Sequence, residues 1–293
     1  FSLAIAIQNL AWGIGTPLFS AFAEKYGDRK AISIGLILYA LGVFISSNAV
    51  SPESHQLLNI LIGFGIAGSG FGPILAVVGR AASAEKRSLA LGITTAAGSA
   101  GQVIGPPFAA ILLSNMPWSS VFEIFAIISL LTICLVPILK TKEDIKYKKS
   151  DEKLKDALNT ALKDPTYIML FFGFFSCGFQ LAFITAHFPA FIIETSSPII
   201  EGSLISFVCT SVEGLGALSM ALIGLFNIIG SIMAGALGKN YTKKYLLSLI
   251  YTGRTIAAIL FIIMPITPSS VALFSIVMGG LWLATVPLTS GLI

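Results

Sequence analysis

The sequence predicts an all-α protein that crosses a membrane several times. Hydrophobic residues make up 55% of the 293 residues, charged residues make up 11%, and the mean hydropathy is +0.90. A soluble domain carries about 25% charged residues. The apolar runs are about 20 residues long and do not alternate with polar residues, which favours spanning helices over the strands of a barrel.

Nine stretches are long and apolar enough to cross a bilayer as helices. They lie at about 1–23, 31–50, 56–79, 87–113, 118–139, 166–192, 214–237, 245–265 and 271–293. The connection 140–165 is polar, but Ser150 is a candidate N-cap and Leu154 and Leu158 fall on one face. This pattern predicts an amphipathic helix along the membrane interface. We expect 194–213 to be a long external loop.

The basic residues are sorted to alternate connections. Seventeen of the eighteen Lys and Arg residues lie in the first, third, fifth and seventh connections, and the connections between these carry none. Because Lys and Arg resist translocation, we expect the four basic connections to be cytoplasmic. The formal net charge of +4 reflects this sorting and gives no reason to expect a nucleic-acid partner.

Two basic turns lie at related positions far apart in the chain. The segments 24–30 and 239–244 each follow a Gly/Ala-rich apolar run, place a Tyr among basic residues and open a new apolar run. Such repetition is typical of transporters built from two related parts, with a site between them. We therefore expect an N-terminal half at 1–139, a linker at 140–165 and a C-terminal half at 166–293.

The first basic turn also carries a family motif. Its pattern is filled here by Ser20, Glu24, Lys25, Gly27, Arg29 and Lys30, with Ser in place of Gly and Glu in place of Asp. A second pattern is matched by Gly98, Gly101, Gly105 and Pro106. These motifs resemble the loop between helices 2 and 3, and helix 5, of the major facilitator superfamily of twelve-helix secondary transporters. The resemblance implies a helical bundle with nine of the twelve spans, an internal fragment that covers helices 2 to 10 and lacks 1, 11 and 12.

Two further stretches, 178–187 and 281–291, are similar to bacterial monocarboxylate-transporter-like members. This narrower resemblance implies a bacterial inner membrane, alternating access and a small organic anion, with or without coupled protons. The superfamily motif of the first basic turn implies that Glu24 with Arg29 or Lys30 forms a charge latch at the cytoplasmic mouth, while a topology signal is the alternative interpretation. The implied gating positions are Glu24, Lys25, Gly27, Arg29, Lys30, Gly98, Gly105 and Pro106.

Arg254 is the one basic residue outside the cytoplasmic connections. At about 1.5 Å per residue past Lys244 it lies ~15 Å deep, near the middle of a ~30 Å core. An Arg there costs about 2.5 to 3.5 kcal/mol on insertion scales. One interpretation is a counter-charge for a carboxylate, and the other is a structural Arg bonded to carbonyls and polar side chains. The resemblance places Arg254 on family helix 9, usually a supporting helix outside the cavity, whereas monocarboxylate and oxalate relatives usually carry their substrate Arg on helix 8.

Two polar residues share a face of the predicted helix 166–192, the seventh family helix. Gln180 lies two turns before His187, and the resemblance implies that this helix lines the cavity. His187 is a candidate proton carrier, because His changes charge near neutral pH. The alternative is a His that hydrogen-bonds a loop beside Pro189.

Further candidates have both a ligand and a packing interpretation. Trp282, Thr285 and Thr289 share a face of the last span and suit a small polar ligand, but such stripes are more often packing. Gln102 either faces the cavity or sits among small residues that bring helices close. Asn227 is a further polar candidate. The predicted substrate-binding set is Arg254, Gln180, His187, Gln102, Trp282, Thr285 and Thr289.

No cofactor is expected. The segment 63–68 matches the dinucleotide fingerprint, with Glu85 at about the right distance, but it lies within an apolar run where helix packing explains the glycines. The three cysteines lack metal-ligand spacing. The leading hypothesis is therefore not an enzyme but a secondary transporter of a small organic anion, in particular a monocarboxylate. The alternatives are a proton-coupled exporter of drugs or metabolites and a membrane-bound nucleotide-dependent enzyme.

Overall fold

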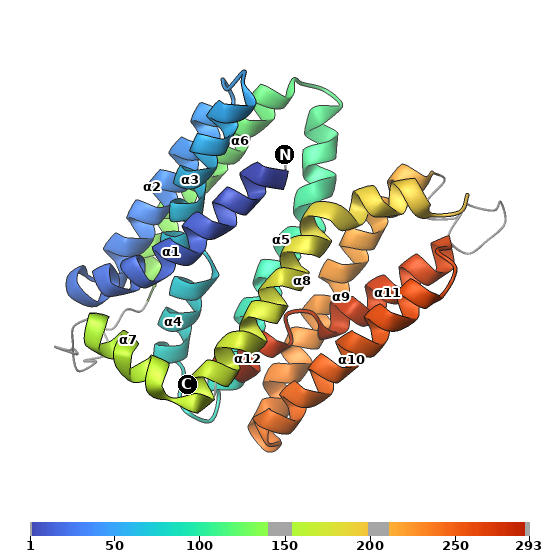
Figure 1. Ribbon diagram of the computed structural model, residues 1–293. Helices are drawn as coiled ribbons and strands as arrows, with labels where there is room; N and C mark the ends of the chain where they lie inside the picture. Colours follow the sequence, from blue (N-terminus) through green and yellow to red (C-terminus); the bar gives the residue numbers. More distant parts are fainter. Residues whose placement is uncertain (1, 140–153, 199–210, 291–293) are drawn as a thin grey trace. The chain divides into compact units, whose positions relative to one another are not determined.

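The computed structural model describes residues 2–139, 154–198 and 211–290 (Figure 1). Every regular element in these ranges is a helix. The elements are α1 (Ser2–Tyr26), α2 (Asp28–Ser46), α3 (Pro52–Ser69), α4 (Phe71–Ala81), α5 (Arg87–Leu113), α6 (Trp118–Leu131), the 3-10 helix η1 (Thr132–Ile138), α7 (Leu154–Lys163), α8 (Pro165–Thr195), α9 (Val212–Asn240), α10 (Lys243–Ile263), α11 (Pro268–Leu281) and α12 (Thr285–Ser290).

Eight helical stretches among the described residues are long and apolar enough to cross a membrane. This count joins α3 with α4, α6 with η1 and α11 with α12 as single spans. The remaining predicted span, 1–23, forms the 25-residue helix α1. Gln8 and Asn9 lower its hydropathy and leave it outside the eight.

Three of the predicted spans are not single α-helices. The span 56–79 is interrupted at Gly70, where α3 ends and α4 begins. The span 118–139 continues past α6 as η1, which contains Pro137; proline removes an i→i−4 hydrogen bond and disturbs the regular helix. The span 271–293 breaks at 282–284, between α11 and α12.

The linker forms a helix, α7, as predicted from its pattern. Its Leu158 and Leu162 side chains are exposed, which fits a helix that presents an apolar face to a membrane surface. The proposed cap, Ser150, lies outside the described residues. The same holds for residues 199–210 of the predicted external loop.

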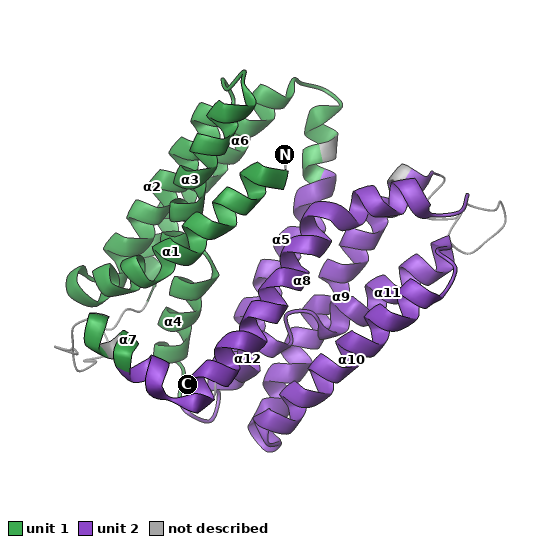
Figure 2. Ribbon diagram, viewed as in Figure 1, with its two compact units in different colours: residues 1–83, 108–159 green, residues 84–107, 160–293 purple. Residues whose placement is uncertain are grey.

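The first of two compact units comprises residues 1–83 and 108–159 (Figure 2). Within it α3 packs against both α1 and α2, and α2 packs against α6 and η1. Val43, Ile62 and Ala126 form an apolar cluster from α2, α3 and α6. These contacts bury the inner faces of the helices.

The glycine-rich segment 63–68 lies inside α3. A Cβ added at Gly63 would collide with the carbonyl oxygen of Gln8 on α1, and one at Gly65 with the backbone of Tyr39 on α2. The glycines therefore allow three helix backbones to approach closely, as small residues do in membrane helices. This position within a packed helix leaves no strand-to-helix turn of the kind that a dinucleotide needs.

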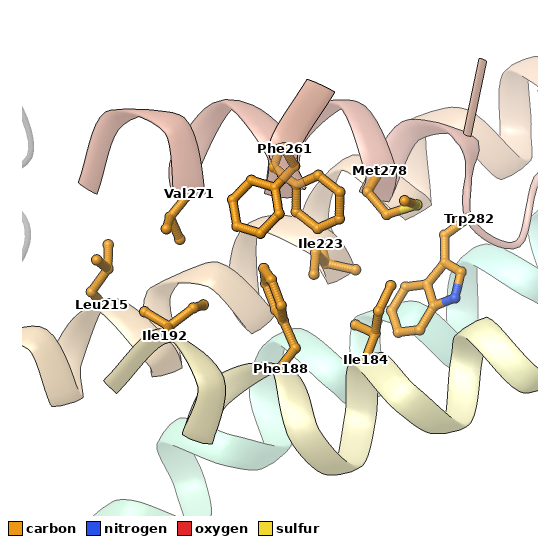
Figure 3. Packing of buried hydrophobic residues seen from close by; sticks show 10 residues of the cluster. Ile184, Phe188, Ile192, Leu215, Ile223, Phe261, Val271, Met278 and Trp282 are labelled. Carbon is orange, nitrogen blue, oxygen red and sulfur yellow. The ribbon is translucent and has the colours of Figure 1, made fainter. Parts of the chain in front are cut away.

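The second unit comprises residues 84–107 and 160–293. In it α9 packs against α8 and α11, and α10 packs against α11 and α12. Figure 3 shows its apolar core, in which the rings of Phe261 and Phe274 stack with centroids 4.3 Å apart and Phe188 lies against both. The division of function between an N-terminal and a C-terminal half stays a prediction.

Candidate functional site

Arg254 lies in α10, and only 1% of the residue is exposed. Its Nη1 donates to the Sγ of Cys177 at 3.4 Å, and its Cζ lies 5.7 Å from the centre of the Tyr251 ring. Its Nε and Nη2 are buried and have no hydrogen-bond partner among the residues that the structure describes. A thiol is a weak acceptor, so most of the hydrogen-bonding capacity of the guanidinium is unused.

Three helices bring polar groups to this arginine. Tyr251, one turn before Arg254 on α10, donates its hydroxyl to the Gly173 carbonyl oxygen of α8 at 3.0 Å. Cys177, also on α8, places its Sγ 3.7 Å from the Oγ1 of Thr285 at the start of α12. We call Arg254, Tyr251, Cys177 and Thr285 the arginine cluster.

The helices around the arginine cluster carry few acidic residues. Within the helices α8, α9, α10, α11 and α12 the acidic residues are Glu194, in the last turn of α8, and Glu213, in the first turn of α9. Neither lies near the middle of a helix, where Arg254 is. The positive charge is therefore not balanced by a carboxylate from the middle of these helices, and a low-dielectric site with such a charge attracts an anion.

The predicted face of Trp282, Thr285 and Thr289 is buried within the second unit. Thr285 belongs to the arginine cluster. Trp282 packs into the apolar core beside Ile184, as Figure 3 shows, and its Nε1 lacks a hydrogen-bond partner in the described residues. Thr289 is 5% exposed.

The other predicted substrate residues are not hydrogen-bonded to the arginine cluster in the described part of the chain. Gln180 is half-buried on α8, and His187 is exposed with its ring centre 5.9 Å from that of Phe183. Gln102 is half-buried on α5, and its Oε1 is a buried atom that has no partner within the described ranges. No hydrogen bond joins these three side chains to the arginine cluster in the described part of the chain.

Sequence reasoning missed two members of the arginine cluster. Tyr251 had a detectable signal, because a residue three positions before Arg254 lies on the same helical face. Cys177 had no detectable signal in the sequence, because it lies 77 residues before Arg254 and on another helix. Only the folded chain brings α8 and α10 together at this point.

The break between α11 and α12 lies next to the arginine cluster in the chain. Leu283, in the break, donates its backbone N–H to the Oδ1 of Asn227 on α9 at 2.9 Å. The Nδ2 of Asn227 donates to the Oγ of Ser99 on α5 at 2.7 Å. The Oγ of Ser231 donates to Asn227 Oδ1 at 3.3 Å. Asn227 therefore connects α5, α9 and the break.

The first basic turn contains one glycine with a backbone that L-residues rarely adopt. Gly27 joins α1 to α2 with φ 101°. The next residue, Asp28, is 5% exposed and forms an ion pair with Arg80 of α4 at 2.8 Å. Arg29 donates its Nη2 to the carbonyl oxygen of Leu139 at 2.9 Å. The turn is thus joined to the ends of α4 and η1 within the first unit.

The predicted latch partner of Glu24, either Arg29 or Lys30, stays a prediction. The ion pair described above involves different residues, and Arg80 lies far from this turn in sequence. The side chain of Lys25 lies over the Tyr26 ring, with its Nζ 5.1 Å from the ring centre.

The glycines of the helix 5 signature do not bring helices together within the second unit. Nothing described lies within 4 Å of a Cβ added at Gly101 or Gly105, and Gly98 and Pro106 are exposed. The close approach on α5 occurs at Gly92, where a Cβ would lie 2.6 Å from the carbonyl oxygen of Ser231. The packing role expected of the small residues around Gln102 stays a prediction; α5 also meets α9 beside Gln102, where a Cβ added at Gly224 would lie 2.9 Å from the side chain of Val103.

Known proteins are similar to this chain in sequence. A family model described as Major Facilitator Superfamily matches residues 1–293. The MFS-type transporter YcxA of Bacillus subtilis is 25% identical over 274 residues, which are 89% of this chain and 62% of YcxA. Monocarboxylate transporter 13 of Bos taurus is 33% identical over 144 residues, 47% of this chain and 32% of that protein. The chain thus spans less than two thirds of the length of these relatives.

A solved structure has the same fold. The fucose:proton symporter of E. coli superposes with a TM-score of 0.73 at 14% identity, covering 98% of this chain and 75% of the symporter. The family model covers the whole chain, and eight stretches are long and apolar enough to span a membrane. This multi-pass membrane protein belongs to the Major Facilitator Superfamily of transporters.

Proposed function

We propose that the chain belongs to a secondary active transporter that moves a small organic anion, a monocarboxylate in particular, by alternating access. The observation that carries the proposal is the buried Arg254, whose Nε and Nη2 have no partner among the described residues. A buried charge with unused donors is costly unless a ligand or a conformational change supplies an acceptor. The anion is that acceptor.

The two unused nitrogens form one edge of the planar guanidinium. Their N–H groups point in the same direction and match the two oxygens of a carboxylate. Nη1, outside this edge, is the nitrogen that contacts Cys177. The arginine cluster therefore leaves available the edge that binds a carboxylate with two parallel hydrogen bonds.

The surroundings favour a small anion. Arg254 is 1% exposed and its neighbours Cys177 and Thr285 are also buried, so the charge-assisted hydrogen bonds form away from water. Entry of a ligand requires the helices around the cluster to separate, which is the movement that alternating access supplies. The break between α11 and α12 is a place where such movement can be absorbed.

The sequence relatives support an anionic substrate. One of them is named a monocarboxylate transporter. The helices α8 to α12 offer an organic cation only Glu194 and Glu213, both near helix ends. In this proposal the basic connections face the cytoplasm, and His187 and Gln180 on α8 are candidates for proton coupling and for a further substrate contact.

Uptake assays on the full-length protein test the proposal. Labelled lactate or pyruvate uptake and the efflux of a cationic dye are measured for the wild type, Arg254→Gln and Arg254→Lys, with surface expression recorded for each. We expect Arg254→Gln to reduce the Vmax/KM for the anion about 100-fold, because a buried charge pair is lost. Arg254→Lys keeps the charge but not the two-pronged geometry, and should retain partial uptake with a raised KM.

Tyr251→Phe is the matched control. It keeps the ring beside Arg254 and removes only the hydroxyl that bonds the Gly173 carbonyl. Normal anion uptake by Arg254→Gln at normal expression would contradict the proposal. Dye efflux without anion uptake by the wild type would favour the drug exporter instead.

A further inference from the structure

The backbone between α11 and α12 lacks part of its helical hydrogen bonding. α11 ends at Leu281 and α12 begins at Thr285. In an unbroken helix each N–H donates to the carbonyl four residues earlier. The N–H of Leu283 instead donates to a side chain, the Oδ1 of Asn227 at 2.9 Å. The break is therefore stabilised from another helix, across 56 residues of sequence.

Asn227 is held firmly enough to act as an anchor. It is 0% exposed, as are Ser99 and Ser231. Its Oδ1 accepts from the hydroxyl of Ser231 as well as from Leu283, and its Nδ2 donates to Ser99. Three hydrogen bonds thus fix the orientation of the Asn227 side chain. Removal of a partner from such a buried network leaves the remaining groups unsatisfied.

The anchored backbone lies two residues before a member of the arginine cluster. Thr285 begins α12 and places its Oγ1 3.7 Å from Cys177 Sγ, which in turn contacts the Arg254 guanidinium. The position of the break therefore sets where Thr285 meets α8. A shift of the break along or around the helix axis would separate Thr285 from Cys177.

We propose that Asn227 is a positioning residue for the anion site: it holds Leu283 and thereby keeps Thr285 against Cys177, the thiol that contacts Arg254. The designation of the arginine cluster as an anion site rests on the proposed function, whereas the clamp on Leu283 does not. Asn227 would not touch the substrate. It would act through the backbone of the break.

The competing explanation is a packing role between α9 and α5 alone. Asn227 and Ser99 join these two helices through their side chains, without any part of the break. A packing role predicts that loss of Asn227 lowers expression and leaves the geometry of Thr285 and Cys177 unchanged. A positioning role predicts that this geometry changes and that the KM rises.

A disulfide-formation assay measures this geometry independently of transport. In the full-length protein all cysteines except Cys177 are replaced, and Thr285→Cys is introduced opposite it. The 3.7 Å between Cys177 Sγ and Thr285 Oγ1 places the two sulfurs side by side, so that a short approach brings them to the ~2.0 Å length of an S–S bond. The rate of oxidation by diamide, which takes up the two electrons and two protons of the thiols, reports how often α8 and α12 meet.

Asn227→Leu removes the polar atoms at similar size. We expect about a tenfold slower disulfide formation and, in the protein with native Thr285, about a tenfold higher KM for lactate, with a smaller change in Vmax. Asn227→Asp should restore the rate of disulfide formation, because a carboxylate still accepts the hydrogen bonds from Leu283 and Ser231. Ser99→Ala is the control that removes the bond to α5 and leaves Leu283 held.

Disulfide formation at the wild-type rate in a normally expressed Asn227→Leu protein would overturn the proposal. If that variant does not reach the surface, Asn227→Gln, which keeps both polar atoms but displaces them by one methylene, is judged by the same rate. Slow disulfide formation together with unchanged uptake by Arg254→Gln would sustain the clamp and refute the anion assignment. Disulfide formation at the wild-type rate together with reduced uptake by Arg254→Gln would refute the clamp and sustain the anion assignment.

Discussion

The guanidinium of Arg254 lies against the thiol of Cys177, with 3.4 Å between Nη1 and Sγ, although 77 residues separate them in the chain. The contact occupies one of the two terminal nitrogens. It thereby turns the edge formed by Nε and Nη2 toward space that no described acceptor occupies. The orientation of the charge, and not only its presence in the membrane, is what suits a carboxylate.

Loss of the thiol should loosen this orientation. We expect Cys177→Ala to raise the KM for the transported anion about threefold, because a weak hydrogen bond to the guanidinium is lost. Cys177→Ser retains an acceptor and should be close to wild type. Cys134→Ala is the matched control, since Cys134 is exposed on η1. Equal kinetics for Cys177→Ala and Cys134→Ala would show that the contact does not orient the arginine.

The ion pair between Asp28 and Arg80 should stabilise the first unit. Asp28 is 5% exposed, so either Asp28→Asn or Arg80→Gln leaves a largely buried charge without its partner. We expect each change to destabilise the protein by about 3 kcal/mol, and the double variant to be less destabilised than the sum of the two. Thermal melting of the purified protein measures this. Lys86→Gln is the control, because Lys86 is exposed in the same connection; an additive double variant would contradict the pairing.

Gly27 should resist replacement for a backbone reason. Its φ of 101° lies where an L-residue is strained. We expect Gly27→Ala to destabilise the protein by about 1 to 2 kcal/mol, seen as a lower melting temperature. At Gly72, in α4, an added Cβ would meet only Thr16 at 3.9 Å, an ordinary contact. A Gly27→Ala protein as stable as Gly72→Ala would show that the turn relaxes to another conformation.

Replacement of Gly230 by a larger residue should disturb the contact between α9 and α11. A Cβ at this position would collide with the backbone carbonyl of Gly280. We expect Gly230→Ala to destabilise the second unit by about 1 to 3 kcal/mol, because a packed backbone must move. Gly101→Ala, where nothing described lies within 4 Å, should have little effect on the melting temperature. Similar melting temperatures for the two variants would indicate that α9 and α11 are less closely packed.

The sorting of basic residues predicts that both basic turns lie on the cytoplasmic side of the membrane. Single cysteines at Lys30 and Lys243 in intact cells should resist a membrane-impermeant maleimide and react after permeabilisation. A cysteine at Pro198, in the connection without basic residues, should react from outside. Labelling of Lys30→Cys and Lys243→Cys from opposite sides would contradict the predicted topology.

The helices were predictable because the membrane restricts the choices. Hydrocarbon offers no hydrogen-bond partners to the backbone, so long apolar runs must be helical, and their lengths are visible in the sequence. The interruptions at Gly70 and at 282–284 were not predicted, since apolar runs continue through both. At the second break the amide oxygen of Asn227, from another helix, accepts the hydrogen bond of the Leu283 N–H.

The sequence alone determined the family motif, the sorting of charge and the presence of one arginine within the membrane core, because each depends on residues that are near in the chain or on composition. Only the tertiary structure decided which groups surround Arg254. Cys177 reaches it from a helix far away in sequence, Thr285 meets Cys177 across 108 residues, and Asn227 meets Ser99 across 128 residues. Such contacts depend on the rotation of each helix about its axis, which side-chain packing between helices sets and which no single helix encodes.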